Sequence, residues 1–327
     1  MARNVRVYQE SFPIRGVFRI SRGSRTTIEP IVVEIGEAGA LGRGEAIASP
    51  RYETVAVALE QAHSLIPRLA EGLDRQALRQ ALPAGAARKA IDCALWGLEA
   101  KRSGQPVWRL ADLPEPGPLT TAFTLSIDTP EAMAAAALDN AHRPLLKLKL
   151  AGDAEDLPRV QAVREHAPFS TLIVDANEAW TPEIYQTMVA GLVDCGVAMI
   201  EQPFPADADG ALADLPRPIP LCADESCHTS ADLPRLRGRY DLINIKLDKT
   251  GGLTEALALR EAARAQGFGI MVGCMLATSL AMAPATLVAQ GAEYVDLDGP
   301  LLLARDREPR LLITDSEIAP LDPELWG

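Results

Sequence analysis

Hydrophobic and polar residues change their spacing along the chain. Residues 1 to about 50 alternate as strands do, for example in the Val-Arg-Val of residues 5–7, because successive strand side chains point to opposite faces. Residues 53 to about 102 are rich in Ala and Leu at helical spacing, with a face of small residues between 86 and 97. These two regions predict an α+β domain that ends near the Pro/Gly-rich stretch 113–118.

After this stretch, short apolar runs alternate with helical segments at near-regular intervals. Eight strands joined by crossover helices are typical of a parallel barrel of the (β/α)8 type. The tail from about residue 304 alternates again, and we expect it to rejoin the first domain. The predicted barrel strands are Thr121–Ile127, Leu145–Leu150, Thr171–Asp175, Ala198–Glu201, Pro220–Asp224, Leu242–Leu247, Gly269–Cys274 and Glu293–Leu297.

The second of these strands carries two lysines, Lys147 and Lys149, on one face and leucines on the other. In a closed barrel the leucine face packs on helices and the lysine face points to the axis. Two ammonium groups there require nearby anions or substrate, and each makes the other easier to deprotonate. A neutral amine is a general base. The alternative is an edge strand whose lysines face water.

Three further strands end in a carboxylate, at Asp175, Glu201 and Asp224. Barrel enzymes place their chemistry at the carboxyl ends of the strands, so the three would point at one spot. A hard divalent cation such as Mg²⁺ would relieve their mutual repulsion. A single strand-end acid is usually the N-cap of the next helix, but three on consecutive strands favour the metal site. Asn177 and Glu225 are suited to orienting such ligands.

Strand six places Asn244, Lys246 and Asp248 on its inner face by alternation. Strands two and six lie across an eight-stranded barrel from each other. Lys149 and Lys246 would therefore approach a substrate from opposite sides, as the removal and return of a proton on two faces of one carbon requires.

Strand eight carries Asp296 and Asp298, which share its inner face and would clamp a cationic group of the substrate. Their alternative role is that of helix caps or turn residues. Residues 18–26 are polar and contain three arginines, which suggests either a loop that meets an anion or a solvated hairpin.

Composition narrows the class of protein. The chain has 327 residues, 48% hydrophobic, and a net charge of −12, which argues against binding to nucleic acid or anionic membranes. No apolar run is long enough for a membrane span, and the start lacks a signal-peptide core. Five scattered cysteines predict free thiols in a reducing cytoplasm, and only four histidines favour a metal with oxygen ligands.

The Lys-x-Lys, the three strand-end acids and Lys246 together resemble the enolase superfamily, in its muconate-lactonizing subgroup. The Asp-x-Asp of residues 296–298 narrows the resemblance to dipeptide epimerases. The segments 20–25, 83–88, 222–228 and 244–257 resemble the bacterial L-Ala-D/L-Glu epimerases.

This resemblance covers nearly the whole chain and implies an α/β fold, a modified TIM barrel of the (β/α)7β type with an α+β capping domain. The barrel would span residues 116–303, and the cap would combine residues 1–115 with the tail 304–327.

The resemblance also implies roles for individual residues. Lys149 and Lys246 would be the acid/base catalysts, and Lys147 would support the enolate oxygen and keep Lys149 less basic. The metal ligands would be Asp175, Glu201 and Asp224, holding one Mg²⁺ per subunit.

The substrate contacts follow in the same way. Asp296 and Asp298 would hold the α-ammonium group of a dipeptide, and Arg25 the side-chain carboxylate of its C-terminal Glu. Thr124 and the turn Cys274, Met275 and Leu276 would line the peptide. Residue 277 is Ala where relatives carry Glu or Cys, so the resemblance does not predict which N-terminal side chain the pocket accepts.

The implied reaction inverts the Cα of the C-terminal residue by two-base 1,1-proton transfer, in the setting of murein-peptide recycling. Alternatives within the superfamily are dipeptide epimerases of other specificity, N-acylamino acid racemases, o-succinylbenzoate synthases and cycloisomerases. A silent barrel that only binds peptides or sugars is the alternative of a different class. The sequence does not determine the oligomeric state, and a homo-oligomer is one alternative.

Overall fold

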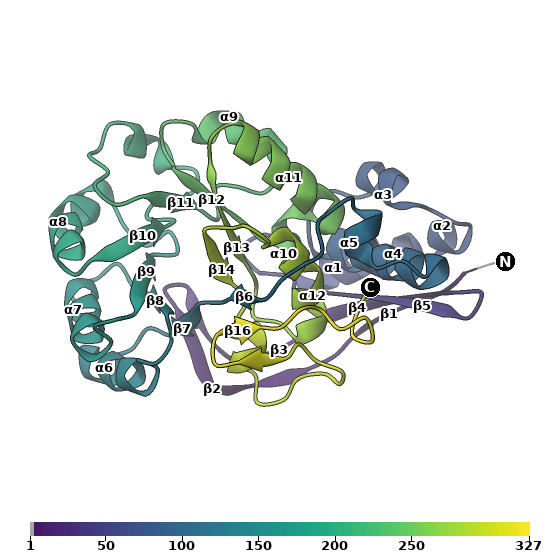
Figure 1. The fold of residues 1–327 in the computed structure, drawn as a ribbon. Coiled ribbons are helices and arrows are strands. Elements are labelled where there is room, and N and C mark those ends of the chain that lie inside the picture. Colours follow the sequence, from purple (N-terminus) through teal and green to yellow (C-terminus); the bar gives the residue numbers. More distant parts are fainter. Residues whose placement is uncertain (1–2) are drawn as a thin grey trace.

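The computed structural model describes residues 3–327, in which an eight-stranded barrel lies beside a smaller cap (Figure 1). The cap contains a three-stranded antiparallel sheet in the order β1-β4-β5. The strands are β1 (Asn4–Gln9), β4 (Ile31–Glu37) and β5 (Ala40–Ala46), and the helices of the cap are α1 (Val55–Ser64), α2 (Ile66–Ala70), α3 (Arg75–Ala81), α4 (Ala86–Ser103) and α5 (Val107–Leu110).

The small residues predicted on one helical face between residues 86 and 97 are explained by the close approach of α4 to the sheet. Strand β5 crosses α4 with Gly42 and Gly44 at the contact, and a Cβ atom on Gly42 would lie 2.0 Å from the carbonyl oxygen of Ala94. Only glycine permits this separation. Ala90 and Ala94 on α4 are fully buried there.

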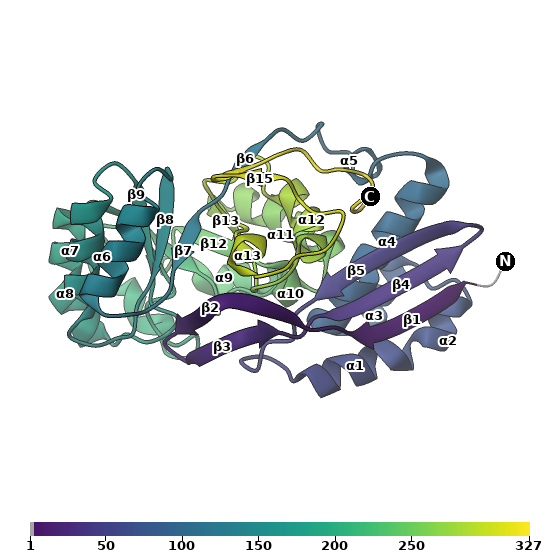
Figure 2. The ribbon, with the colours of Figure 1, turned by 90° about the horizontal axis from the view of Figure 1, so that it is seen from below.

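Residues 18–26 form part of a hairpin. Strands β2 (Phe12–Ile20) and β3 (Gly23–Ile28) pair in antiparallel register. Figure 2 shows this hairpin running from the cap sheet along the barrel toward β7 and β8. A hydrogen bond from Ile127 N to Arg19 O joins it to the barrel. The segment therefore has the form of a hairpin rather than an irregular loop.

All eight predicted barrel strands are present, and each neighbouring pair is parallel. The strands are β7 (Phe123–Leu125), β8 (Leu145–Lys149), β9 (Thr171–Asp175), β10 (Val197–Glu201), β11 (Leu221–Ala223), β12 (Leu242–Ile245), β13 (Gly269–Gly273) and β14 (Tyr294–Asp296). Between β14 and β7 the barrel is bridged by a hydrogen bond from Ala122 N to Val295 O. The enclosed axis that the two lysines require is therefore present.

Helices cover the outside of the barrel. They are α6 (Pro130–Asp139), α7 (Asp156–His166), α8 (Pro182–Asp194), α9 (Leu233–Leu236), α10 (Leu247–Thr250), α11 (Leu253–Ala265), α12 (Ser279–Val288) and α13 (Gly299–Leu302). The crossover from β10 to β11 contains the 3-10 helix η1 (Asp209–Ala213), and η2 (Ser230–Asp232) precedes α9. Among residues 3–327, no helix is long and apolar enough to cross a membrane.

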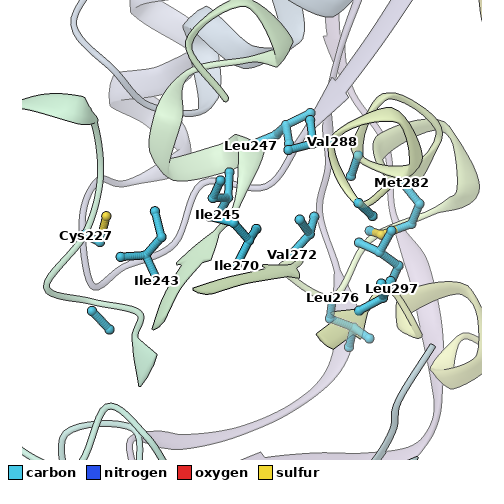
Figure 3. Packing of buried hydrophobic residues seen from close by; sticks show 14 of the residues in the cluster. Cys227, Ile243, Ile245, Leu247, Ile270, Val272, Leu276, Met282, Val288 and Leu297 are labelled. Carbon is cyan, nitrogen blue, oxygen red and sulfur yellow. The ribbon is translucent and has the colours of Figure 1, made fainter. Parts of the chain in front are cut away.

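Alternation along the strands separates the outer core from the interior. Ile243 and Ile245 on β12 and Ile270 and Val272 on β13 point outward and pack with helical residues such as Met282 (Figure 3). The intervening residues point to the axis. They form a separate apolar cluster of Ala122, Leu145, Ile173, Met199, Cys222, Leu242 and Met271 at the base of the barrel.

The tail contacts both parts of the molecule. Strands β15 (Ile313–Thr314) and β16 (Glu317–Ile318) form a small sheet with β6 (Leu119–Thr120), which precedes the barrel. Farther on, the indole Nε1 of Trp326 donates to Cys93 O on α4 at 3.0 Å. All five cysteines are free, which confirms the prediction of unpaired thiols.

The contact between β5 and α4 makes a testable prediction. Gly42→Ala should destabilise the protein by about 1–3 kcal/mol or more, because the new methyl group meets backbone atoms that cannot rotate away. Denaturant unfolding would measure this. Gly117→Ala is the matched control, because a Cβ atom there has no neighbour within 4 Å. Equal stability of the two variants would contradict the account of this contact.

Candidate functional site

A layer of charged side chains lies directly on the apolar base of the barrel. On β8 the inward residues are Leu145, Lys147 and Lys149, so the charges begin one pleat above the apolar cluster. Lys147 is 1% exposed and Lys149 is 7% exposed. The alternative of a solvated edge strand is therefore excluded for both lysines. The apolar cluster below them cannot screen their charge, so nearby carboxylates must compensate it.

Those carboxylates are two of the three predicted strand-end acids, Asp175 and Glu201, and Asp296. Lys147 Nζ lies 2.6 Å from Glu201 Oε2, 3.2 Å from Asp175 Oδ2 and 2.8 Å from Asp296 Oδ2. Lys149 Nζ donates to Asp175 Oδ2 at 2.6 Å. The lysines and acids thus form one continuous network rather than isolated pairs.

Asp175, Glu201 and Asp224 converge as the strand positions predict. One carboxylate oxygen from each lies within 4.8 Å of the others, and all three residues are buried. None of the three serves as the N-cap of the next helix. The helices α8 and η2 that follow two of them begin at other caps, Thr181 and Thr229.

The electrostatics of this triad fit a bound cation. Burial and the charge of Asp175 raise the pKa of Glu201 above its ordinary value. Burial alone would also raise the pKa of Asp175, but Lys149 and Lys147 hold it below its usual range. Glu201 Oε2 is buried and makes no hydrogen bond of normal geometry within residues 3–327, although Lys147 lies near it. One carboxylate oxygen from each of the three residues makes a donor set that suits a hard divalent cation.

The acids also change one expectation about the lysines. Burial and mutual repulsion would lower the pKa of Lys147, but Asp296, Glu201 and Asp175 raise it well above the ordinary lysine value. The predicted repulsion between the paired lysines is therefore outweighed at Lys147. The physical reason is that three carboxylates lie within 3.2 Å of its Nζ, against one neighbouring ammonium group.

The end of strand six differs from the alternation that was predicted. Strand β12 stops at Ile245, and residues 247–250 form the helical turn α10. Lys246 keeps its inward position and donates to Asp224 Oδ2 at 2.6 Å. Asp248 does not point into the barrel: its carboxylate accepts from Lys89 and from Ile47 N of the cap. The strand period no longer applies once the backbone becomes helical.

The same turn brings in a lysine that sequence reasoning missed. Lys249 is fully buried, and its Nζ donates to Asp224 Oδ1 at 2.7 Å and to Asn244 O at 3.0 Å. Asp224 thus has a lysine on each carboxylate oxygen, and its pKa lies well below the ordinary value although burial opposes this. The sequence signal for this turn is the Gly251-Gly252 pair, and in the structure Gly251 ends the turn with a left-handed φ of 75°.

Asp296 and Asp298 meet at Thr124. Asp298 Oδ2 accepts from Thr124 N at 2.7 Å, and Asp296 Oδ1 lies 3.5 Å from Thr124 Oγ1. Burial and the charge of Asp296 raise the pKa of Asp298 to about 7. Asp298 occupies the N-cap position of α13, but its side chain makes no capping bond. The predicted pair is therefore assembled, though Asp298 lies beyond the end of β14.

A cavity of about 90 Å³ lies between the charged layer and the cap. Lys149 and Lys246 line it from opposite strands. Asp224, Arg25 and the predicted turn Cys274, Met275 and Leu276 also line it. Thr124, Asp296 and Asp298 do not line it. The lining residues that sequence reasoning missed are Phe18, Ile20, Ile47, Ser49 and Tyr52, all contributed by the cap.

The three arginines of the hairpin have different surroundings. Arg22 donates to Glu225 Oε1 at 2.6 Å and also pairs with Glu178. Arg19 lies 3.5 Å from Asp128 Oδ2. The guanidinium of Arg25 lines the cavity and makes no hydrogen bond or ion pair with any of residues 3–327. Arg25 is therefore the hairpin arginine that is available to an anionic ligand.

Comparison with known families agrees with this geometry. Residues 131–322 match the family model described as enolase C-terminal domain-like, and residues 2–111 match the N-terminal domain of mandelate racemase / muconate lactonizing enzymes. The chain belongs to the enolase superfamily. The (β/α)7β barrel with a cap, as predicted, is the fold of its structural neighbours.

Two curated members of the superfamily are similar along nearly their whole length. The L-Ala-D/L-Glu epimerase of Escherichia coli K12 is 48% identical over 319 residues, which cover 97% of this chain and 99% of the relative. The N-acetyl-D-glutamate racemase of a Pseudoalteromonas species is 46% identical over 303 residues, covering 91% and 95%. Both are isomerases by name.

Solved structures show the same likeness. An enolase-family member from Agrobacterium tumefaciens, with sodium and L-Ala-L-Glu bound, superposes with a TM-score of 0.97 at 48% identity, covering 99% of this chain and 100% of that one. The dipeptide epimerase of Methylococcus capsulatus, complexed with Mg and L-Arg-D-Lys, has a TM-score of 0.88 at 30% identity, with 98% of each chain covered.

The carboxylate triad predicts a cation-dependent stability. Mg²⁺ should raise the melting temperature of the wild-type protein, because a ligand at 100 times its Kd stabilises by about 2.7 kcal/mol. Asp175→Asn, Glu201→Gln and Asp224→Asn should each lose most of this rise, measured as the shift between EDTA and Mg²⁺ for each variant. Asp298→Asn, outside the triad, should keep it. A full shift in all three triad variants would show that Mg²⁺ binds elsewhere.

Proposed function

We propose that the protein is a Mg²⁺-dependent dipeptide epimerase that acts on L-Ala-D/L-Glu and inverts the Cα of the C-terminal residue. The observation that carries the proposal is the placement of Lys149 and Lys246 on opposite strands, β8 and β12, with both lining one cavity. Two amines on opposite sides of one carbon permit proton removal on one face and return on the other. The named activities of the similar relatives support it.

In this reaction the protein must make the weakly acidic α-proton of the C-terminal residue removable. Loss of the α-proton next to a carboxylate puts further negative charge on that group. Mg²⁺, one per subunit, would supply Lewis-acid stabilisation of that charge when bound at Asp175, Glu201 and Asp224. Lys147 adds a fixed, desolvated ammonium group beside the same site. Lys149 takes the proton and Lys246 returns one, or the reverse.

Substrate selection would use charges at both ends of the ligand. Arg25 is the unpaired cation of the cavity wall and suits the side-chain carboxylate of a C-terminal Glu. Asp296 and Asp298 suit the α-ammonium group. They lie near Cys274, which lines the cavity, since burial and then these two aspartates raise the pKa of its thiol. A cation beside Asp298 would also favour its ionised form over the neutral one.

A second candidate is racemisation of an N-acylated glutamate. One observation favours it: the cavity is lined by Arg25 and the two lysines but by neither Asp296 nor Asp298. An N-acyl amino acid has no ammonium group and would not need the aspartates. The similarity to the N-acetyl-D-glutamate racemase supports this alternative. We place it second, because the pair of buried acids around Thr124 would then have no cation to bind apart from Lys147.

The proposal includes a setting and a division of labour. The reaction suits murein-peptide recycling in the cytoplasm, where five free thiols would remain reduced. Residues 116–303 would act as the catalytic barrel, and residues 1–115 with 304–327 as the cap that selects substrate. The bond from Trp326 to α4 supports the assignment of the tail to the cap.

The two-base assignment predicts a stereochemical pattern. Lys149→Ala and Lys246→Ala should each abolish epimerisation in both directions, because each direction uses both lysines. Each variant should still exchange the α-proton with solvent for one isomer, and the retained isomer should differ between the two. Deuterium uptake into L-Ala-L-Glu and L-Ala-D-Glu, followed by mass spectrometry, measures this. Loss of exchange for both isomers in both variants would contradict the assignment.

The charges at the ends of the ligand predict its specificity. L-Ala-L-Glu should react faster than L-Ala-L-Leu and faster than N-acetyl-L-glutamate, as kcat/KM measurements would show. Arg25→Ala should reduce the preference for Glu over Leu by about 10- to 100-fold, because an ion pair at a partly open wall is worth less than a fully buried one.

Arg19→Ala is the control in the same hairpin, since Arg19 pairs with Asp128 and does not line the cavity. It should leave the preference unchanged. A wild-type enzyme that prefers N-acetylglutamate would decide for the second candidate.

A further inference from the structure

The first turns of cap helix α4 carry three charged residues that are all buried. Arg88 is 7% exposed, and Lys89 and Asp92 are 1% exposed. Such burial costs free energy unless each charge is paired. None of the three pairs with another charge in the cap. They all contact one barrel segment, residues 246–254, which follows β12 and contains Lys246.

Each charge holds a different part of that segment. Lys89 Nζ donates to Asp248 Oδ2 at 2.7 Å, and the other oxygen of Asp248 accepts from Ile47 N at 2.8 Å. Arg88 donates to Thr250 O at 2.6 Å. Asp92 accepts from Thr254 N at 3.0 Å and from Thr254 Oγ1 at 2.6 Å. A side chain, a carbonyl and a helix start are thus held by one rigid helix.

The two glycines within the segment leave room for this contact because they have no side chains. Gly251 and Gly252 have φ angles of 75° and 114°. A Cβ atom at Gly251 would lie 2.3 Å from Arg88 Nε, and one at Gly252 would lie 2.4 Å from Asp92 Oδ2. The tight turn after Lys246 is therefore the place where α4 reaches the barrel backbone.

We infer that Arg88, Lys89 and Asp92 are positioning residues that hold segment 246–254, and with it the ammonium group of Lys246, at the face of the substrate that Lys246 serves. The inference rests on the proposed two-base reaction and deepens it, because it gives the cap a part in proton transfer besides substrate selection. Lys246 is the residue directly before the held turn, two positions from Asp248.

The positions of the two lysines explain why a shift of segment 246–254 should slow proton transfer on the Lys246 face and not on the Lys149 face. Lys246 stands at the end of its strand, where the backbone leaves the sheet for α10. Lys149 stands inside the hydrogen-bonded register of β8 and β9, opposite Asp175. A small shift of segment 246–254 would therefore displace Lys246 and leave Lys149 in place. Because proton transfer depends on distance, misplacement lowers the rate on one face.

The test compares solvent exchange of the α-proton for L-Ala-L-Glu and L-Ala-D-Glu in full-length variants, calibrated with Lys246→Ala and Lys149→Ala. Lys89→Met and Asp92→Asn should reduce exchange at least tenfold more for the isomer that Lys246→Ala loses than for the other. Glu45→Gln is the matched control: Glu45 is a fully buried cap acid that contacts Thr278 and Arg307 instead. It should leave the ratio of the two rates unchanged.

The double variant Lys89→Met/Asp248→Asn separates positioning from stability, because it leaves no buried charge unpaired. It should melt closer to the wild type than Lys89→Met does and still show the one-sided loss. Equal loss for both isomers, the same asymmetry in Glu45→Gln, or an asymmetry that disappears in the double variant would overturn the inference.

A readout without substrate separates this inference from the proposed reaction. Amide hydrogen exchange of residues 246–254 should be faster in Lys89→Met than in wild type, and that of residues 147–151 unchanged. Unchanged exchange in 246–254 would overturn the inference even where the enzyme is active. A wild-type protein that exchanges the α-proton of neither isomer would refute the proposed reaction. Amide hydrogen exchange would then still test whether α4 holds residues 246–254.

Discussion

The structure depends on the balance of charge that is buried at the carboxyl end of the barrel. Four ammonium groups, those of Lys147, Lys149, Lys246 and Lys249, face the carboxylates of Asp175, Glu201, Asp224, Asp296 and Asp298, and all nine residues are buried. Each group left without a partner in such a place would cost several kcal/mol. The charge of each lysine or acid in this layer is therefore stabilised only in the presence of the others.

This balance links base strength to the metal site. Asp175, Glu201 and Asp224, which together with Asp296 hold the pKa of Lys147 and Lys246 high, are also the carboxylates that are arranged for a cation. A carboxylate whose charge is already shared with a divalent cation attracts an ammonium group less. The lysines of such a site then become easier to deprotonate, which is what a general base requires. The repulsion between Lys147 and Lys149 that alternation suggested would matter under that condition.

Alternation predicted the strands and the inward residues well because period two is a property of the backbone. It placed Lys147, Lys149, Asp175, Glu201 and Asp224 together with no knowledge of the fold's details. It failed where the backbone changed type, at residues 246–250, so that Asp248 was assigned to the barrel and Lys249 was overlooked. The choice of Arg25 over its neighbours could not come from spacing, since it depends on which arginines pair with carboxylates in loops far along the chain.

The cap is more than a cover over this layer. It supplies the hairpin with Arg25, the wall residues Ile47 and Tyr52, and the helix α4. Relatives that are named for a dipeptide and for an N-acetylated amino acid are about equally similar to this chain, so the barrel chemistry alone does not set the substrate. On the proposed function, the difference would lie where the N-terminal half of the ligand rests, between Asp298, the turn at Cys274 and the cap. Because α4 contacts the segment that carries Lys246, a substitution in the cap that alters specificity by shifting α4 would, on the inference above, alter proton transfer on one face as well.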